Sequence, residues 1–299
     1  MSAAQRSPGA SWDSPLEASG DHRGEDGGMQ TPPSPQGPVD GGWGFQIPGS
    51  DYDSFMGRYS RPLATLVADA ADVNAGLTVL DVGCGPGALT GELVKRLGVR
   101  SVMACDPSAP FVQECSARYP GVDVRPGSAE DIPFDDASVD VVLAQLVLHF
   151  VGDPQRALAQ FRRVLRPQGR AAVCVWDAAG GMQMLRAFWD AALAVDPAAP
   201  DESRHLRFGQ AGEIDDLFAA GGWAVLPEST LTVSAAYDDF DDLWSGFLAG
   251  VGPAGAYCVG LSEQHRAAVR SQLFRELGSP TGDFSLDAVA RCAVAVAPD

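Results

Sequence analysis

Basic residues are scarce in this sequence. It has 21 Lys and Arg residues against 39 Asp and Glu residues, which gives a formal net charge of -18 at pH 7. No basic stripe or Lys/Arg-rich segment offsets this charge locally. Because the phosphate backbone of a nucleic acid is also negatively charged, the two would repel each other. We therefore expect no nucleic acid among the partners.

Long hydrophobic runs are also absent. No stretch of about eighteen consecutive apolar residues occurs, which is the length that a membrane-spanning helix needs. The first residues lack the charged-then-apolar pattern of a secretory signal. From these absences we expect no membrane partner and a cytoplasmic location.

Closely spaced cysteine pairs are missing as well. The 6 cysteines show no Cys-x-x-Cys spacing, and most of them stand in apolar, strand-like contexts. Cysteines of this kind usually behave as small buried hydrophobic residues. We predict buried free thiols rather than disulfides, and no metal site, for Cys84, Cys105, Cys115, Cys174, Cys258 and Cys292.

The composition divides the chain into three parts. Residues 1–42 are rich in Ser, Gly, Pro, Asp and Glu and contain almost no large apolar side chains. They cannot offset the entropy lost on ordering, so we predict a disordered tail. We expect residues 43–180 to form a Rossmann-like cofactor-binding core with an N-terminal lid helix, and residues 181–299 to form a helical cap plus the last strands of the same sheet.

Short apolar runs alternate with helical patterns from Leu77 onward. This alternation is typical of parallel strands joined by crossover helices. It predicts an α/β fold with a Rossmann-like, doubly wound, mostly parallel sheet and an inserted helical cap. One crossover helix begins near Gly87, and another begins at Asp153 and Pro154. The predicted strands are Leu77–Asp81, Ser101–Asp106, Val122–Arg125, Val139–Ala144 and Ala171–Trp176.

The second half of the chain has a looser pattern. Strand-like runs at Trp223–Ser234 and Val289–Val296 are predicted to complete one edge of the sheet, and residues 252–255 to form a turn. Helices are predicted at Met182–Val195, Glu213–Ala220, Phe240–Leu248 and Glu263–Leu277. The cap would cover the carboxyl end of the sheet, where open α/β sheets bind ligands. The aromatic residues that would either line an apolar substrate pocket or fill the core are Trp189, Phe240, Trp244, Phe247 and Tyr257.

A glycine-rich turn follows the first predicted strand. Gly83, Gly85 and Gly87 stand at alternate positions, where they allow backbone conformations and a close approach of ligand that a Cβ atom would block. Gly83, Gly85 and Ala88 also satisfy the loose dinucleotide-binding fingerprint, and Asp106 lies near the distance expected for a ribose-binding acid. The turn alone therefore leaves a nicotinamide-dependent oxidoreductase open as an alternative.

Asp81, two residues before the first glycine, distinguishes between the two ligands. Its carboxylate would face the pyrophosphate of a dinucleotide at short range, which is unfavourable. S-adenosylmethionine has no phosphate and carries an ammonium group and a sulfonium cation, so a carboxylate here favours that cofactor. Asp106, followed by Pro107 at the end of the second strand, is placed to accept hydrogen bonds from both ribose hydroxyls.

These residues resemble motif I of the class I S-adenosylmethionine-dependent methyltransferases. The segment covered is about Tyr52 to Asp177, and the order and spacing of its motifs are similar to the ubiquinone/menaquinone-biosynthesis-type branch. The resemblance implies S-adenosylmethionine as cofactor and a small-molecule methyl acceptor. The motifs that carry it are residues 81–87, 127–134, 139–142 and 165–170.

The resemblance also implies further contacts. Ala129 and Glu130 would border the adenine, and Gln145 would lie near the methionine moiety, while Leu146 and His149 would face the substrate.

Residues 52–62 resemble the lid helix of many family members, in which Tyr52, Arg58 and Tyr59 would contact the cofactor. Arg58 would pair with the cofactor carboxylate. A helix that only packs on the sheet explains this segment equally well.

Methyl transfer is an in-line displacement, so alignment of nucleophile, methyl group and sulfur supplies most of the catalysis. A general base is needed only for a hydroxyl, an acidic carbon or a protonated amine, and His149 is the candidate by its position and by the ordinary pKa of histidine. A non-catalytic S-adenosylmethionine-binding protein is a further alternative. The acceptor, the methylated atom and the oligomeric state stay open.

Overall fold

The computed structural model describes residues 49–177, 180–204 and 206–298. The predicted disordered tail at residues 1–42 lies outside these ranges. No helix in the described ranges is long and apolar enough to cross a membrane. All 6 cysteines are buried and free, which confirms the prediction of unpaired thiols.

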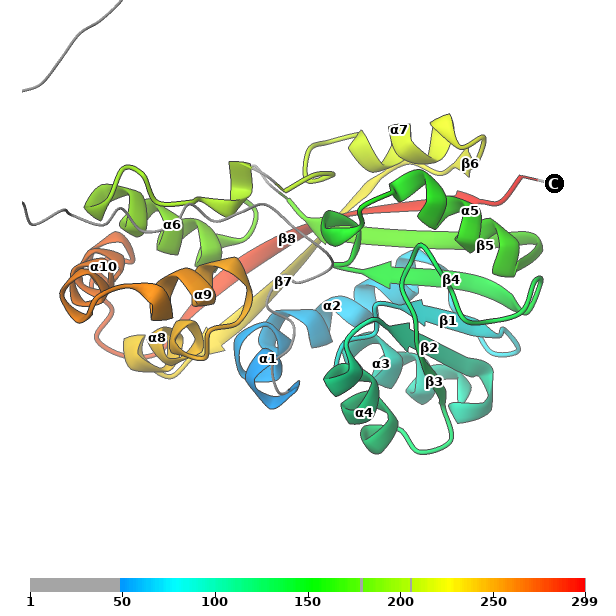
Figure 1. Ribbon diagram of the computed structural model, residues 1–299, viewed down its shortest axis with the longest axis horizontal. Coiled ribbons are helices and arrows are strands. Elements are labelled where there is room, and N and C mark those ends of the chain that lie inside the picture. Colours follow the sequence, from blue (N-terminus) through cyan, green and yellow to red (C-terminus); the bar gives the residue numbers. More distant parts are fainter. Residues whose placement is uncertain (1–48, 178–179, 205, 299) are drawn as a thin grey trace, which may run out of the picture. The chain divides into compact units, whose positions relative to one another are not determined.

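An eight-stranded sheet runs through the described part of the chain in the order β3-β2-β1-β4-β5-β8-β6, with β7 paired to β8. Strands β1 to β5 pair in parallel, and β8 is antiparallel to its three neighbours. The predicted α/β fold with a doubly wound, mostly parallel sheet is confirmed (Figure 1). The strands are β1 (Val79–Val82), β2 (Val102–Asp106), β3 (Asp123–Pro126), β4 (Val139–Gln145), β5 (Leu165–Trp176), β6 (Ala224–Val225), β7 (Ser229–Tyr237) and β8 (Phe284–Val296).

Helices cover both faces of the sheet, because side chains alternate from one face to the other. In β4, Val141 and Leu143 join one hydrophobic cluster, whereas Val142 and Ala144 join another. Figure 1 shows α5 and α7 on one face and α2 and α3 on the other. Their bounds are α2 (Gly57–Ala70), α3 (Ala88–Leu97), α5 (Pro154–Val164) and α7 (Glu213–Ala220).

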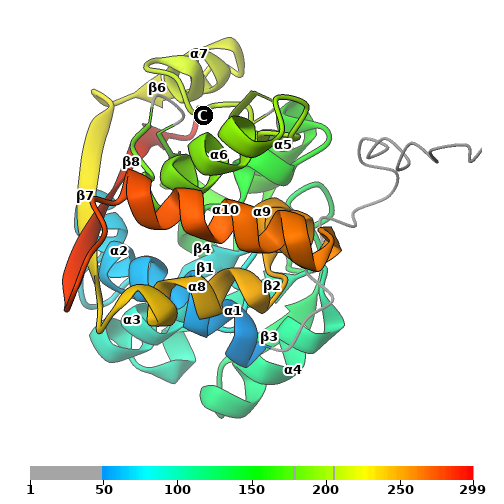
Figure 2. The ribbon, with the colours of Figure 1, turned by 90° about the vertical axis from the view of Figure 1, so that its left-hand side faces the viewer.

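The cap consists of four helices beside the long β7–β8 ribbon (Figure 2). Its apolar side chains continue the cluster to which α2 contributes, so the cap and one face of the sheet share a core. A short 3₁₀ helix, η3 (Glu202–Arg204), follows the first cap helix. The cap helices are α6 (Gln183–Val195), α8 (Phe240–Leu248), α9 (Gly252–Gly260) and α10 (Glu263–Glu276).

The predicted lid segment forms two helices, α1 (Gly49–Phe55) and α2, which are separated at Met56. Pro62 stands inside α2 without ending it. Helix α4 (Ala109–Arg118), between β2 and β3, was not predicted, although Pro110 stands in its first turn, as is common at helix starts.

Three local predictions were wrong. Residues 252–255 are not a turn but the start of α9, because Pro253 occupies a first-turn position that tolerates proline. The single strand predicted at Trp223–Ser234 is two strands, β6 and β7. Strand β5 begins at Leu165 rather than Ala171, with a register shift between Val139 and Val141 of its partner β4.

Candidate functional site

The glycine turn lies where the order of the strands reverses. From β1 the chain crosses to β2 and β3 on one side, whereas β4 and β5 lie on the other side. Ligands bind at such a point in doubly wound sheets. Gly83, Gly85 and Gly87 have φ angles of +69°, +54° and +98°, in the region that L-residues rarely adopt. The conformational reason given for these glycines is confirmed.

Gly83 also meets a close neighbour. A Cβ atom at this position would lie 2.4 Å from a methyl group of Val147. The N–H groups of Gly83 and Cys84 donate to the carbonyl of Cys105 at 2.8 and 3.0 Å, which fastens the turn to β2. Around Gly85 the space is open, because a Cβ atom there would meet nothing within 4 Å.

A cavity opens at this turn, and we call it the turn cavity. Asp81 is 1% exposed, and its carboxylate accepts a hydrogen bond from the Thr90 hydroxyl at 2.6 Å. Burial raises the pKa of Asp81 to about 7, and the Thr90 hydrogen bond offsets part of that rise. The turn cavity is lined by Tyr52, Ser60, Asp81, Gly83, Cys84, Gly85, Pro86, Ala88, Leu89, Gln145 and Leu146.

Two buried polar atoms in the wall of the turn cavity have no hydrogen-bond partner in the described structure. They are Oε1 of Gln145 and Oγ of Ser60. The amide nitrogen of Gln145 donates to the Ser60 carbonyl at 2.8 Å, which fixes the orientation of the amide. A buried polar atom without a partner costs free energy, so these two atoms would be stabilised by a polar ligand.

Asp106 lies at the end of β2 beside the glycine turn. One carboxylate oxygen accepts from the N–H of Gly85 at 2.9 Å, and the other accepts from the N–H of Ser108 at 2.8 Å. Burial raises the pKa of Asp106, and these two hydrogen bonds act in the opposite direction. Asp106 thus holds the turn in place, while its contact with a ribose stays a prediction. Pro107 is exposed, and its cofactor contact is likewise a prediction.

Ala129 and Glu130 belong to the loop after β3. Ala129 is buried in the hydrophobic cluster beneath α5. The Glu130 carboxylate accepts from the N–H of Asp153, and the Glu130 carbonyl accepts from Arg156 at 2.8 Å. The structure thus gives Glu130 partners at the start of α5, and neither residue belongs to the lining of the turn cavity.

A second cavity, which we call the apolar cavity, shares Tyr52 and Leu146 with the turn cavity. Leu146 has a φ angle of +62°, which is rare for a residue with a side chain and is found mostly at constrained or functional positions. The ionisable residues in the lining of the apolar cavity are Tyr52, His149 and Glu202. The apolar cavity is lined by Tyr52, Phe55, Met56, Leu146, His149, Phe150, Trp176, Leu185, Glu202, Leu206, Val251, Gly252, Pro253 and Ala254.

His149 is 8% exposed and lies on the 3₁₀ helix η2 (Leu148–Phe150). Its Nδ1 lies 2.5 Å from the Arg207 carbonyl, which can only accept, so Nδ1 carries the proton and Nε2 has a free lone pair. Burial lowers the pKa of His149 to about 4. The imidazole is therefore neutral at pH 7 and a weak base.

Glu202, on η3, was missed by the sequence analysis. It is 8% exposed, and one carboxylate oxygen accepts from the indole N–H of Trp189 at 3.0 Å. Burial raises the pKa of Glu202 to about 7, against the lowering effect of the Trp189 hydrogen bond. The residues around it, Asp201, Ser203 and Arg204, are polar, and in sequence they have the pattern of a solvated loop.

Comparison with known proteins indicates the family to which the residues of this site belong. Residues 80–173 match the family model described as a methyltransferase domain. Residues 80–173 of this chain therefore carry a methyltransferase domain. The match to this family gives the oxidoreductase alternative no support.

Two sequence relatives are named as methyltransferases, and one solved structure shares the fold. An uncharacterized methyltransferase from Mycobacterium tuberculosis is 40% identical over 129 residues, which cover 42% of this chain and 51% of that protein. Nocamycin O-methyltransferase from Saccharothrix syringae is 28% identical over 249 residues, which cover 76% of this chain and 86% of that protein. The crystal structure of the YcgJ protein from Bacillus subtilis has a TM-score of 0.51 at 18% identity, covering 79% of this chain and 98% of that one. The chain spans about half or less of the length of the relatives that are 38 to 40% identical to it.

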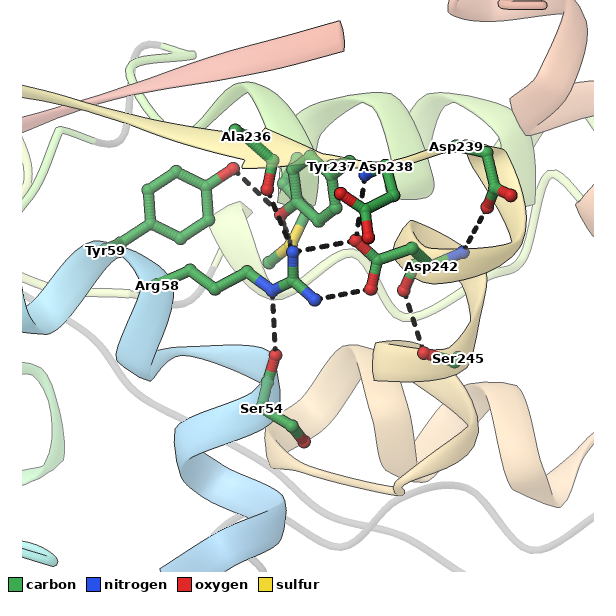
Figure 3. A network of polar contacts seen from close by, with 10 residues as sticks. Ser54, Arg58, Tyr59, Ala236, Tyr237, Asp238, Asp239, Asp242 and Ser245 are labelled. Carbon is green, nitrogen blue, oxygen red and sulfur yellow. Dashed lines mark hydrogen bonds and ion pairs between the residues drawn. The ribbon is translucent and has the colours of Figure 1, made fainter. Parts of the chain in front are cut away.

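Arg58 and Tyr59 stand outside the turn cavity of the methyltransferase domain. Figure 3 shows the Arg58 guanidinium between α2 and α8, where it pairs with both carboxylate oxygens of Asp242 and donates to the Ala236 carbonyl at 2.9 Å. The Tyr59 hydroxyl lies 3.0 Å from the hydroxyl of Tyr237. Of the three predicted lid residues, the structure brings only Tyr52 to the turn cavity.

The cap aromatics mostly fill the core. Trp189, Phe240, Trp244 and Phe247 are buried in the cluster shared by the cap and α2, and Tyr257 packs against it. None of the five belongs to the lining of the apolar cavity within the described structure. Trp189 reaches that cavity only indirectly, through its hydrogen bond to Glu202.

Proposed function

We propose that this protein transfers a methyl group from S-adenosylmethionine to a small-molecule acceptor. The observation that carries the proposal is the wall shared by the two cavities, formed by Tyr52 and Leu146. A cofactor in the turn cavity and an acceptor in the apolar cavity would meet at these residues. The net charge of -18 supports a small molecule over a nucleic acid. The similarity to nocamycin O-methyltransferase supports an acceptor oxygen as the methylated atom.

The residues of the turn cavity fit the cofactor. The partnerless Gln145 Oε1 and Ser60 Oγ offer acceptors for an ammonium group, and the Asp81 carboxylate supplies opposite charge. The open space at Gly85 leaves room for close approach of a ligand to the backbone. When bound, S-adenosylmethionine would supply a methyl group on a positively charged sulfur.

The apolar cavity would orient the acceptor and exclude water. Its lining is mostly aliphatic and aromatic, as in Phe55, Leu185 and Val251. Exclusion of water strengthens electrostatic interactions between the bound groups. His149 would contact the acceptor through Nε2, but with a pKa of about 4 it is a poor proton acceptor at neutral pH.

Titration of S-adenosylmethionine into the protein, followed by calorimetry at pH 6 and pH 8, tests the proposal. Because the pKa of Asp81 is raised to about 7, its carboxyl group is mostly protonated at pH 6 and attracts a cation less. We expect the affinity of the wild-type protein to fall by about tenfold from pH 8 to pH 6. Asp81→Asn should bind roughly 10- to 100-fold more weakly at pH 8 and should lose most of this pH dependence.

Asp123→Asn is the matched control. Asp123 is an exposed carboxylate on β3 that pairs with Arg125, away from both cavities. This variant should keep wild-type affinity at both pH values. Wild-type protein that does not bind S-adenosylmethionine, or Asp81→Asn with unchanged affinity, would contradict the proposed cofactor site.

A further inference from the structure

Glu202 is a buried carboxylate in a cavity whose wall is otherwise mainly apolar. Only one of its two oxygens has a hydrogen-bond partner in the described part of the chain, the indole N–H of Trp189 at 3.0 Å. Burying a carboxylate without full compensation destabilises a folded protein. A structural role alone would be served as well by an uncharged side chain, because the Trp189 hydrogen bond needs only an acceptor.

Arg186 and Arg204 form ion pairs with carboxylates other than that of Glu202. Arg186 pairs with Asp201 at 2.9 Å and with Asp190 at 3.0 Å, and Arg204 lies 4.0 Å from Asp201. Within the described ranges, Glu202 forms no ion pair. Its charge is therefore available to a molecule in the apolar cavity.

His149 is less suited to receive a proton in this cavity. Its Nε2 atom is buried and has no partner in the described structure, and its Nδ1 is held by the Arg207 carbonyl. Protonation would create an imidazolium cation within an apolar wall, which is unfavourable. Burial accordingly lowers the pKa of His149 to about 4. By contrast, burial raises the pKa of Glu202 to about 7, which is close to the value at which a general base is most effective near neutral pH.

We propose that Glu202 accepts the proton of the acceptor, and that the acceptor is a neutral, largely apolar molecule with an acidic hydroxyl group such as a phenol or an enol. This inference rests on the proposed function. The hydroxyl would donate to the carboxylate oxygen that lacks a protein partner, while Trp189 holds the other oxygen. Trp189 is thus a positioning residue for Glu202.

The transfer step balances in atoms and charge. As the acceptor oxygen forms its bond to the methyl carbon, its proton passes to the Glu202 carboxylate, and the electron pair of the breaking carbon–sulfur bond stays on sulfur. A sulfonium cation and a carboxylate anion become a neutral sulfide and a carboxylic acid. Because the reaction removes both charges, an apolar cavity that excludes water favours it. Proton transfer to His149 would instead leave a cation there.

The same charge determines which acceptors bind. An ionised carboxylate in a wall of low polarity repels an anionic acceptor and attracts a hydrogen-bond donor. We expect 2-naphthol and 4-propylphenol to bind and 2-naphthoate to be rejected. Replacement of the Glu202 carboxylate by an amide should reduce the difference in affinity between the two phenols and 2-naphthoate.

Calorimetric binding of the three probes to protein saturated with S-adenosylhomocysteine, and their turnover with S-adenosylmethionine, test the inference. Wild-type protein should bind and methylate the two phenols, and should bind 2-naphthoate at least tenfold more weakly. Glu202→Gln should lower kcat/KM for the phenols by at least about 100-fold while leaving the affinity for S-adenosylhomocysteine within twofold. Glu202→Asp, which keeps the carboxylate, should recover part of the loss.

Asp196→Asn is the matched control, because it removes an exposed carboxylate from the segment just before Glu202, outside the lining of the cavity and outside the ion pairs of Arg186 and Arg204. It should keep the wild-type preference for phenol over naphthoate. Glu202→Gln with kcat/KM within threefold of wild type would overturn the inference. So would wild-type protein that binds S-adenosylhomocysteine but neither binds nor methylates either phenol, although the proposed function would then stand. Failure to bind S-adenosylhomocysteine would instead contradict the proposed function.

Discussion

Gly83 and Gly76 both adopt positive φ angles, +69° and +94°, but their surroundings differ. A Cβ atom on Gly83 would lie 2.4 Å from Val147, whereas a Cβ atom on Gly76 would meet nothing within 4 Å. Any L-residue at either position would adopt an unfavourable backbone conformation, but only a residue at Gly83 would also clash with a neighbouring side chain. The pair therefore separates conformational freedom from close packing as reasons for glycine.

We predict that Gly83→Ala destabilises the protein more than Gly76→Ala does. The left-handed conformation should cost each variant on the order of 1 kcal/mol. The contact with Val147 should cost Gly83→Ala about 1 to 3 kcal/mol more. Urea unfolding gives both free energies. Equal losses would mean that Val147 moves aside without cost.

Leu146 and Glu202 are two further single residues in unfavourable settings, one through its backbone conformation and the other through the burial of its charge. Leu146 holds a φ angle of +62° where the two cavities meet, and Glu202 places a carboxylate in the mainly apolar wall of one of them. Both features carry a cost in folding free energy. Their occurrence in the same cavity wall supports a functional origin for both.

Among the structural elements, α2 and α8 are joined by the pair of Arg58 and Asp242 (Figure 3). The side chains are 31% and 23% exposed, and Arg58 also lies 4.9 Å from the centre of the Tyr237 ring. The Asp242 carboxylate accepts a further hydrogen bond, at 3.2 Å, from the N–H of Asp238. The interaction therefore links the N-terminal helices to the cap through two oxygens with defined geometry.

We predict a coupling free energy of about 1 kcal/mol between Arg58 and Asp242 in a double-mutant cycle of Arg58→Ala and Asp242→Ala. The exposed pair of Arg125 and Asp123, at 46% and 47%, is the comparison and should give less than half of that value. Unfolding in urea at low and moderate salt measures both cycles. A coupling for Arg58 and Asp242 no larger than for the surface pair would argue against a structural link through this contact.

The sequence predicted elements well where local patterns determine them. Strands β1, β2 and β4 and helix α8 are found within two residues of their predicted positions, because apolar runs and the Asp239 cap mark their limits. Helix α9 was missed because its sequence, from Gly252 to Gly260, is rich in glycine and begins with a Gly-Pro dipeptide typical of a turn. Its helical state depends on packing against α6 and α8, which local sequence does not encode.

The candidate site was predicted in part for the same reason. Asp81, Gly83 and Gly85 stand in one contiguous segment with a specific spacing, and the structure brings them to one cavity with Gln145, whereas Gly87 is not part of its lining. Arg58 is close in sequence to a residue of that cavity, Tyr52, but its partner Asp242 is 184 residues away. Glu202 gave no signal, because its burial results from contacts of η3 with the cap.

At the scale of the whole molecule, β8 connects the cap to the sheet. Its residues Ala288 and Ala290 belong to the cluster shared by the cap and α2, whereas Ala293 and Ala295 belong to the cluster beneath α5 and α7. The strand pairs with β5 over Ala290–Val296 and with β7 over Phe284–Cys292. Loss of either cluster would remove partners from the other.

We therefore predict that the cap and the sheet unfold as one cooperative unit. Binding of S-adenosylhomocysteine, the product formed from the cofactor, should stabilise both. Native-state hydrogen exchange should give the same opening free energy for the slowest amides of α10 and of α5. S-adenosylhomocysteine at 100 times its Kd should raise both values by about 2.7 kcal/mol. Asp81→Asn at the same ligand concentration, where binding is weaker, should show a smaller rise in both helices. If only the α5 amides gain protection, the cap opens independently of the sheet, and water would reach the apolar cavity without global unfolding.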